Sequence, residues 1–142
     1  FYGETSSFVI YLFTSIESFT NQLIPDDYVF IRKLSSKTES FDKNQIQDNI
    51  DFKTKVKEVL KDAKGKGFFD KDTPANQHIW NLKDFRNDII HTKPQKDNVL
   101  WYDNLIKKSL NFKYTETLES VAKFMNFYKP DYIVECDCGK DF

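Results

Sequence analysis

Cysteine is scarce in this sequence, and its placement limits the role that it can have. The only two cysteines, Cys136 and Cys138, stand one residue apart near the end of the chain. Two such close cysteines cannot form the disulfide framework that stabilises small secreted domains, so we expect a reducing, cytoplasmic setting. They could instead be half of a zinc site, which needs four ligands, but a polar tail is the favoured interpretation.

Long apolar runs and clustered glycines are also lacking. There is no apolar run of about 18 residues and no basic-then-apolar leader, so we expect neither a membrane span nor a secretion signal. The four glycines are too few and too scattered for a glycine-rich phosphate loop. No helical metal-ligand motif occurs, and we expect no metal and no cofactor.

Arginine is nearly missing. Of the 21 basic side chains only Arg32 and Arg86 are arginine, and the rest are lysine. A guanidinium offers a planar fork of donors that matches phosphate or carboxylate, which an ammonium does not, so Arg86 is a candidate for a role that depends on shape. The net charge of -1 gives no general attraction to nucleic acid, and a site for a polyanion would have to come from local clustering.

Aromatic residues, by contrast, are abundant. An apolar content of 39% with 14 phenylalanines can fill the core of one domain over residues 1–142. Apolar residues at spacings of three and four predict an all-α bundle of about four to six helices. The helices are expected over about 8–24 with a cap at 5–7, from 46 or 51 to 63, and over 73–91, 97–110 and 115–128.

Other segments give weaker signals. Residues 28–34 are apolar but of uncertain type, and the polar residues 35–40 have the composition of a loop. Five lysines between 53 and 64 are expected on a solvated helix face, with attraction of phosphate as the alternative. Thr73 and Pro74 predict a helix start, and Pro94 predicts that this helix ends near His91.

The helix that ends near His91 carries the candidate chemistry. Asn87 and His91 are four apart and share one face, while Arg86 is offset by about one residue's rotation around the axis. Arg86 could hold a phosphate while His91 acts as general acid or base. RNA is the natural substrate class, because its own 2'-hydroxyl can act as the nucleophile. The bland alternative is that Arg86 pairs with Asp84 or Asp88 and that His91 merely terminates the helix.

The segment Arg86-Asn87-Asp88-Ile89-Ile90-His91 resembles the arginine, polar residue, three residues, histidine motif of the HEPN superfamily of small helical domains. The resemblance extends over about residues 6–130, with 131–142 as a tail. It includes a first helix like Ile16-Glu17-Ser18-Phe19-Thr20-Asn21, a lysine-rich middle helix, and a closing helix like the segment from Leu118 to Phe127.

The resemblance implies a metal-independent endoribonuclease that acts as a homodimer with a composite site, such as a toxin or a phage-defence effector. Arg86 would stabilise the phosphate, His91 would be the acid or base, and Asn87 would orient one of them. Glu17 and Asn21 are candidate supporting residues, although an ordinary solvated strip is the slightly favoured interpretation of the pair.

Two function classes stay open. One is the endoribonuclease, and the other is a non-catalytic HEPN module that binds a nucleotide, RNA or a protein partner, since fold does not fix function. A regulatory or antitoxin partner is an expectation of the resemblance. In the branch regulated by a nucleotidyltransferase antitoxin a tyrosine follows the histidine by two residues, and Lys93 at that position argues against that form of regulation.

Overall fold

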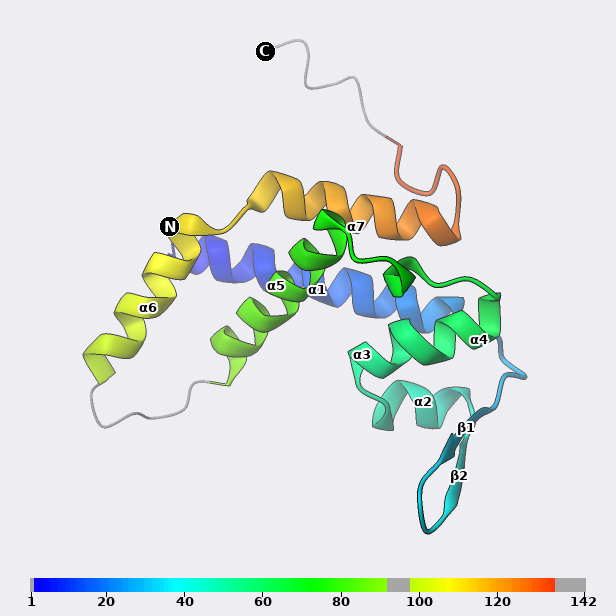
Figure 1. Cartoon of the computed structure of the whole chain (residues 1–142). Helices are drawn as coiled ribbons and strands as arrows, with labels where there is room; N and C mark the ends of the chain where they lie inside the picture. The colour runs from blue at the N-terminus through cyan, green and yellow to red at the C-terminus, as the bar shows by residue number, and fades with distance from the viewer. Residues whose placement is uncertain (1, 92–97, 135–142) are drawn as a thin grey trace.

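The protein is a mostly α-helical bundle with one small antiparallel hairpin, as the apolar spacing predicted for the helical part (Figure 1). The computed structural model describes residues 2–91 and 98–134. In chain order the elements are α1 (Tyr2–Leu23), β1 (Phe30–Lys33), β2 (Thr38–Phe41), α2 (Lys43–Asn49), α3 (Phe52–Thr54), the π-helical segment η1 (Lys55–Val59), α4 (Leu60–Lys64), the 3-10 turn η2 (Phe68–Asp70), α5 (Pro74–Ile90), α6 (Asn98–Asn111) and α7 (Tyr114–Tyr128).

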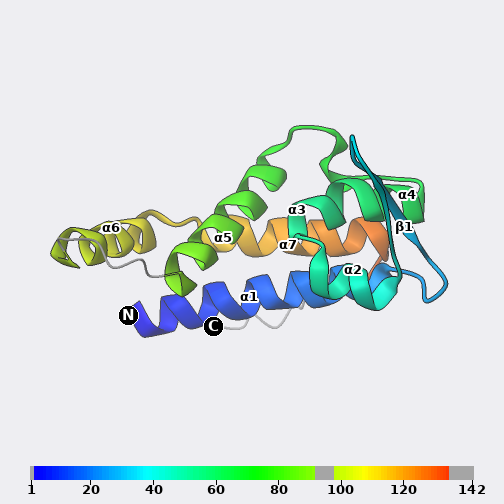
Figure 2. The same cartoon turned by 90° about the horizontal axis from the view of Figure 1, so that it is seen from below.

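The core lies where α5 crosses the pair formed by α1 and α7. Figure 2 shows α1 and α7 running side by side in the same direction, with α5 crossing them at an angle. Each of the three helices contributes a fully buried phenylalanine, and these are Phe13, Phe85 and Phe124. Burying an aromatic side chain removes a large apolar surface from water, so these residues are major contributors to the stability of the crossing.

The first helix begins earlier than the sequence predicted. Residues 5–7, expected to be its cap, lie inside α1, where the Ser7 hydroxyl donates a hydrogen bond of 2.8 Å to the carbonyl oxygen of Gly3. Serine and threonine can form such bonds within a helix, so their presence alone does not mark a helix start. Leu12, Ile16, Phe19 and Leu23 follow one another at helical spacings of three and four, and the last three are buried while Leu12 is half-buried.

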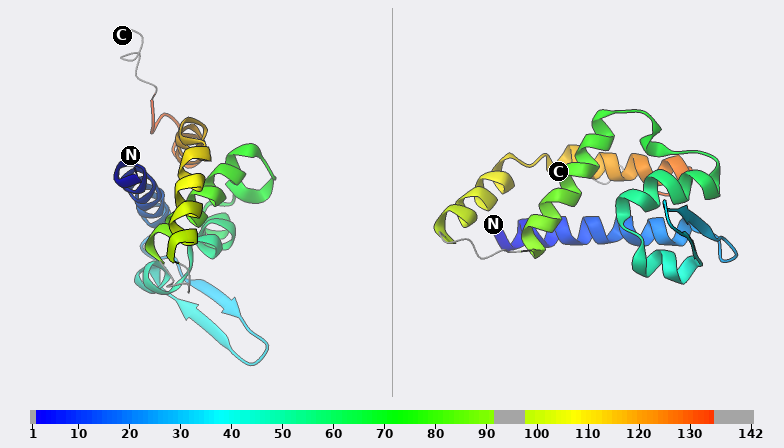
Figure 3. Two further views of the ribbon diagram at one scale, coloured as in Figure 1. Left: turned by 90° about the vertical axis from the view of Figure 1, so that its left-hand side faces the viewer. Right: turned by 60° about the horizontal axis from the view of Figure 1, so that its bottom comes forward.

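The predicted loop at residues 35–40 is partly right, because residues 34–37 connect the strands of a β-hairpin, while 38–40 belong to its second strand. Strands β1 and β2 pair with Phe30 opposite Phe41 and Arg32 opposite Glu39. Figure 3 shows the hairpin projecting from the end of the bundle near α2. Cross-strand pairs stabilise such ribbons, and here Arg32 Nη2 lies 2.7 Å from Glu39 Oε2. Four-residue strands are too short to produce a clear alternating pattern in the sequence.

The lysine-rich segment folds as several short helices instead of one. Asp42 caps α2 in a capping box with Gln45, and Asp51 caps α3 by accepting a bond from the Thr54 amide. The helix then widens into η1 before α4, which ends at Gly65 in the left-handed conformation (φ 67°). Glycine adopts this conformation without steric cost, so the helix ends there, one residue beyond the predicted end at residue 63.

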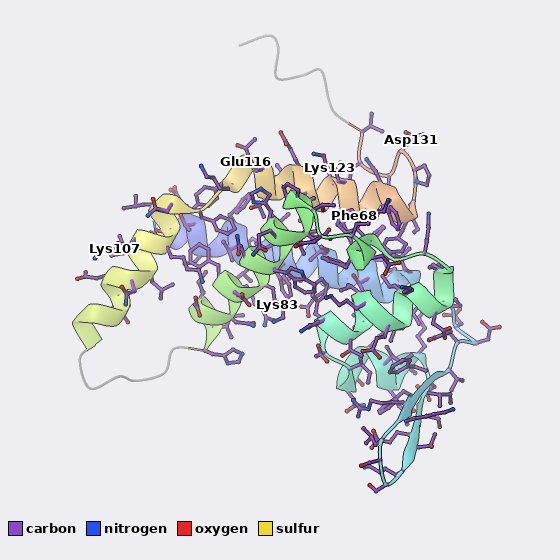
Figure 4. The ribbon with its side chains drawn as sticks, viewed as in Figure 1. Phe68, Lys83, Lys107, Glu116, Lys123 and Asp131 are labelled. Atoms are coloured by element: carbon purple, nitrogen blue, oxygen red, sulfur yellow. The ribbon has the colours of Figure 1, made fainter. Side chains whose placement is uncertain are left out.

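An aromatic cluster holds the connection between α4 and α5 against α7. Phe68, labelled in Figure 4 beside α7, lies 5.3 Å from Phe124 and 5.6 Å from Phe127 between ring centroids. Phe69 next to it lies 4.6 Å from Trp80 of α5. Edge-on and tilted ring contacts of this kind stabilise a connection that contains little regular structure.

The helix α6 extends away from the bundle (Figure 1). Leu105 is buried, whereas Ile106 and Leu110 are 43% and 65% exposed. The predicted start at Asp97 lies outside the described residues. Within the described part of the chain, no helix is long and apolar enough to cross a membrane.

Candidate active site between α1 and α5

The helix that carries the motif starts and ends where its flanking residues predicted. Thr73 caps α5 by accepting a hydrogen bond of 3.3 Å from the Asn76 amide, and Pro74 occupies the first turn. At the other end His91 is the C-cap, and its amide donates to the Asn87 carbonyl oxygen at 2.8 Å. These two ends fix the length of α5 and therefore the turn on which Arg86 stands.

Arg86 is half-buried between α5 and α1, with incomplete hydrogen bonding. Its Nη1 donates to the Asn87 carboxamide oxygen at 3.2 Å, and its Nη2 lies 3.9 Å from Glu17 Oε2, too far for a hydrogen bond. Its guanidinium carbon lies 5.3 Å from the centroid of the Phe13 ring. Its Nε is buried and has no hydrogen-bond partner among the described residues. The buried Nε is out of reach of a ligand, but Nη2 makes no hydrogen bond to a described residue and 27% of the side chain is exposed, so Arg86 retains donor capacity at Nη2.

The only other arginine, Arg32, forms a directly hydrogen-bonded ion pair and serves as a comparison for Arg86. Arg32 donates to Glu39 Oε2 from Nε at 3.0 Å and from Nη2 at 2.7 Å. Both bonds have the geometry of strong, charge-assisted interactions. The contrast indicates that Arg86 is held in place but is not neutralised in the way that Arg32 is.

The acidic neighbours of Arg86 in sequence do not pair with it. Asp84 lies 3.8 Å from the Lys83 ammonium, and Asp88 accepts a hydrogen bond from Lys108 of α6. Among the described residues, the carboxylate paired with the guanidinium is Glu17, on a different helix. The simplest alternative, in which Asp84 or Asp88 occupies Arg86, is therefore wrong.

Asn87 and His91 differ in their surroundings. Asn87 is half-buried, and its side chain contacts Arg86. His91 is exposed, and within the described residues no hydrogen bond or ion pair joins its imidazole to Arg86. The structure of one chain therefore links Arg86 with Asn87 and Glu17, and leaves His91 apart at the end of the helix.

Glu17 and Asn21 share a face of α1 beside a surface groove of about 470 Å³. The Asn21 carboxamide oxygen is buried and accepts no hydrogen bond from any described residue. An unpartnered buried acceptor costs free energy, so its presence calls for an explanation. We call this hollow the α1–α2 groove. It is lined by Thr14, Glu17, Ser18, Asn21 and Gln22 of α1 and by Lys43 and Gln47 of α2.

Lys55 binds the backbone of Gln47, a residue that lines the groove, and its surroundings were predicted wrongly. It was expected on a solvated face, but it is 6% exposed, and its ammonium donates to the Gln47 carbonyl oxygen at 2.8 Å. Burial lowers the pKa of Lys55, while the negative charges of Glu17, Asp48 and Asp51 act to raise it.

A signal for Lys55 was present in the spacing of its neighbours. Lys55 follows Phe52 by three positions and precedes Val59 by four, which places it on the buried stripe of a regular helix. It is also the first residue of η1, and single π-helical turns are frequent at functional sites.

The described residues contain no group of three or more histidine, cysteine, aspartate or glutamate side chains arranged to hold a metal ion. Cys136 and Cys138 lie outside the described residues, so the proposed half zinc site has no structural account.

No known protein family, curated protein or solved structure matches the chain. The similarity to HEPN domains therefore rests on the motif and on the order of its helices, and it remains an expectation.

Proposed function

We propose that this protein is an endoribonuclease that needs no metal and that cleaves RNA by attack of the 2'-hydroxyl on the adjacent phosphate. The observation that supports this proposal is the state of Arg86, which bonds to Asn87 at 3.2 Å, lies 3.9 Å from Glu17 and keeps 27% of its side chain exposed. A guanidinium that is positioned but not neutralised suits binding of a phosphate whose charge grows in the transition state.

The reaction needs a base for the 2'-hydroxyl and an acid for the leaving 5'-oxygen. Histidine titrates near neutrality and can take either role. Each chain offers one histidine in the motif, His91, which is exposed and is not joined to its own Arg86. A homodimer that brings together the α5 ends of two copies would supply two histidines and two arginines to one composite site.

In this dimer the attacking oxygen loses its proton to one His91, and the bond from phosphorus to the 5'-oxygen breaks. The other His91 protonates the leaving oxygen. The products are a 2',3'-cyclic phosphate and a 5'-hydroxyl. One proton leaves the 2'-hydroxyl and one is added to the 5'-oxygen, so no water is consumed. Arg86 binds the non-bridging oxygens, and Asn87 orients Arg86 through its carboxamide oxygen.

The chemistry can be tested by changing the substrate. An RNA oligonucleotide should be cut in the presence of EDTA to give a cyclic phosphate end, and the same oligonucleotide with deoxyribose at the cleavage site should stay intact. Specific activity should fall on dilution in proportion to the dimer fraction measured by analytical ultracentrifugation. Cutting of the deoxy substrate would contradict the proposed nucleophile, and activity of the monomer would contradict the composite site.

The alternative is a module that binds a nucleotide, RNA or a protein without cutting. The near-neutral charge of the chain and the Glu17 carboxylate beside Arg86 favour it. Under this alternative Arg86→Met weakens ligand binding while His91→Ala changes nothing, because the imidazole has no chemical step to perform. A cytoplasmic location, expected from the two cysteines, and a regulatory partner, expected from the resemblance, are further parts of the nuclease proposal.

A further inference from the structure

The α1–α2 groove begins at the residue that contacts Arg86. Glu17 lines the groove and also lies 3.9 Å from the Arg86 guanidinium. Figure 2 shows α2 beside the second half of α1, the part that carries the groove. A ligand with a phosphate at Arg86 therefore has its next chemical group at the mouth of this groove.

Every residue that lines the groove is polar, and its charges balance. Glu17 and Lys43 contribute one charge of each sign, and the Lys43 ammonium already donates to Asp26 at 2.6 Å. Such a surface does not suit a second phosphate, which would require net positive charge. An apolar ligand is unsuitable too, because it would bury polar groups without partners.

Two side-chain amides of the groove have hydrogen-bonding capacity to spare. The Asn21 oxygen has no partner but is buried, so a ligand reaches it only when the Asn21 side chain turns towards the groove. Among the described residues none binds the side chain of Gln47, whose backbone carbonyl oxygen accepts a hydrogen bond from Lys55. Asparagine and glutamine amides match the paired donor and acceptor on an edge of adenine. The groove volume of about 470 Å³ lies within the usual range for small-ligand sites, about 300–1,000 Å³.

We propose that the α1–α2 groove binds the base of the nucleotide next to the phosphate at Arg86, through the amides of Asn21 and Gln47, with adenine as the preferred base. This inference rests on the proposed function for the position of the phosphate. It adds a determinant of sequence preference on a helix pair that does not carry the motif.

The test combines a binding arm with a cleavage arm. In the binding arm, AMP and UMP are titrated into the 15N-labelled protein, and AMP should shift the side-chain amide signals of Asn21 and Gln47 more than UMP does. In the cleavage arm, an RNA library is cut and the cut sites are sequenced. Loss of one good bidentate contact lowers discrimination by about 5- to 150-fold. Gln47→Leu should therefore reduce a preference for adenine at one position beside the cut by that factor.

Gln77→Leu is the matched control, because Gln77 is an exposed amide on α5 outside the groove. Asn21→Leu tests the same base preference from the α1 side of the groove. If Asn21→Leu fails to fold, Gln47→Leu, at a half-buried site on α2, still tests the proposal.

The two proposals fail in different ways. RNA cutting with a base preference that Gln47→Leu leaves unchanged overturns the groove and leaves the nuclease standing. AMP shifts in the groove without any RNA cutting overturn the nuclease and support the groove. If the protein shows no RNA cutting and AMP causes no shifts in the groove, both proposals are overturned.

Discussion

The contact between Arg86 and Glu17 leads to a prediction that distinguishes a guanidinium still able to bind phosphate from one neutralised by a strong ion pair. Two unit charges 3.9 Å apart interact by about 1 kcal/mol in water and by about 4 kcal/mol at an effective dielectric constant near 20. The two side chains keep 27% and 34% of their surface exposed, so solvent screens the pair and the lower value applies. We expect a coupling energy of about 1 kcal/mol.

A double-mutant cycle measures this coupling. Urea unfolding of the wild type, Glu17→Gln, Arg86→Met and the double variant gives the pair term, and the effect of Glu17 on Lys55 cancels because it occurs in both arms. Since no hydrogen bond joins Arg86 to Glu17, the coupling should fall by more than about half in 1 M salt, where the screening length is about 3 Å.

The pair of Arg32 and Glu39 is the internal reference. Its two hydrogen bonds of 3.0 and 2.7 Å should preserve part of its coupling in high salt. If Arg86 and Glu17 instead couple by more than about 3 kcal/mol and salt leaves that value unchanged, Glu17 locks the guanidinium and the proposed phosphate site is wrong.

Three further predictions concern the framework. Burial lowers the pKa of Lys55 below 10.5, so the unfolded chain binds more protons than the folded chain as the pH approaches 10.5. The free energy of unfolding of the wild type, relative to that of Lys55→Met, should therefore rise towards pH 10.5 in urea unfolding at a series of pH values. A difference that does not change with pH would contradict the burial. Phe85→Ala should lower the free energy of unfolding by about 3–5 kcal/mol, measured by denaturant unfolding, and a loss under about 1 kcal/mol would show that the crossing of α5 is not the core. Gly65→Ala should cost about 1–2 kcal/mol because of the left-handed backbone there, and an unchanged thermal midpoint would contradict that geometry.

Local signals predicted the ends of the helices well. Thr73 and Pro74 mark the start of α5 and Gly65 the end of α4, because each acts through its own backbone or through an amide three residues away. The cap predicted at residues 5–7 was wrong for a local reason too, because serine and threonine can either cap a helix or form hydrogen bonds inside one. The hairpin was missed because its short strands give too few positions for an alternating pattern.

The composition of the candidate site was only partly predictable. The motif on α5 and the shared face of Glu17 and Asn21 on α1 follow from helical spacing. That Glu17 is the carboxylate paired with Arg86 depends on how α1 and α5 cross, which a single sequence does not determine. Burial of Lys55 was missed because a charged residue is ordinarily assigned to solvent, although its spacing from Phe52 and Val59 pointed inward.

Cleavage of RNA by four matched variants tests the central claim most directly. The chain contains two arginines and two histidines, so Arg32→Lys and His78→Ala are controls for Arg86→Lys and His91→Ala. With EDTA present and the fold verified by circular dichroism, the two controls should cut like the wild type. Arg86→Lys should cut more slowly than the wild type, because lysine lacks the fixed fork of donors. His91→Ala should cut about 100-fold or more slowly than the wild type. Wild-type cleavage by folded His91→Ala protein would show that His91 is not the acid or base.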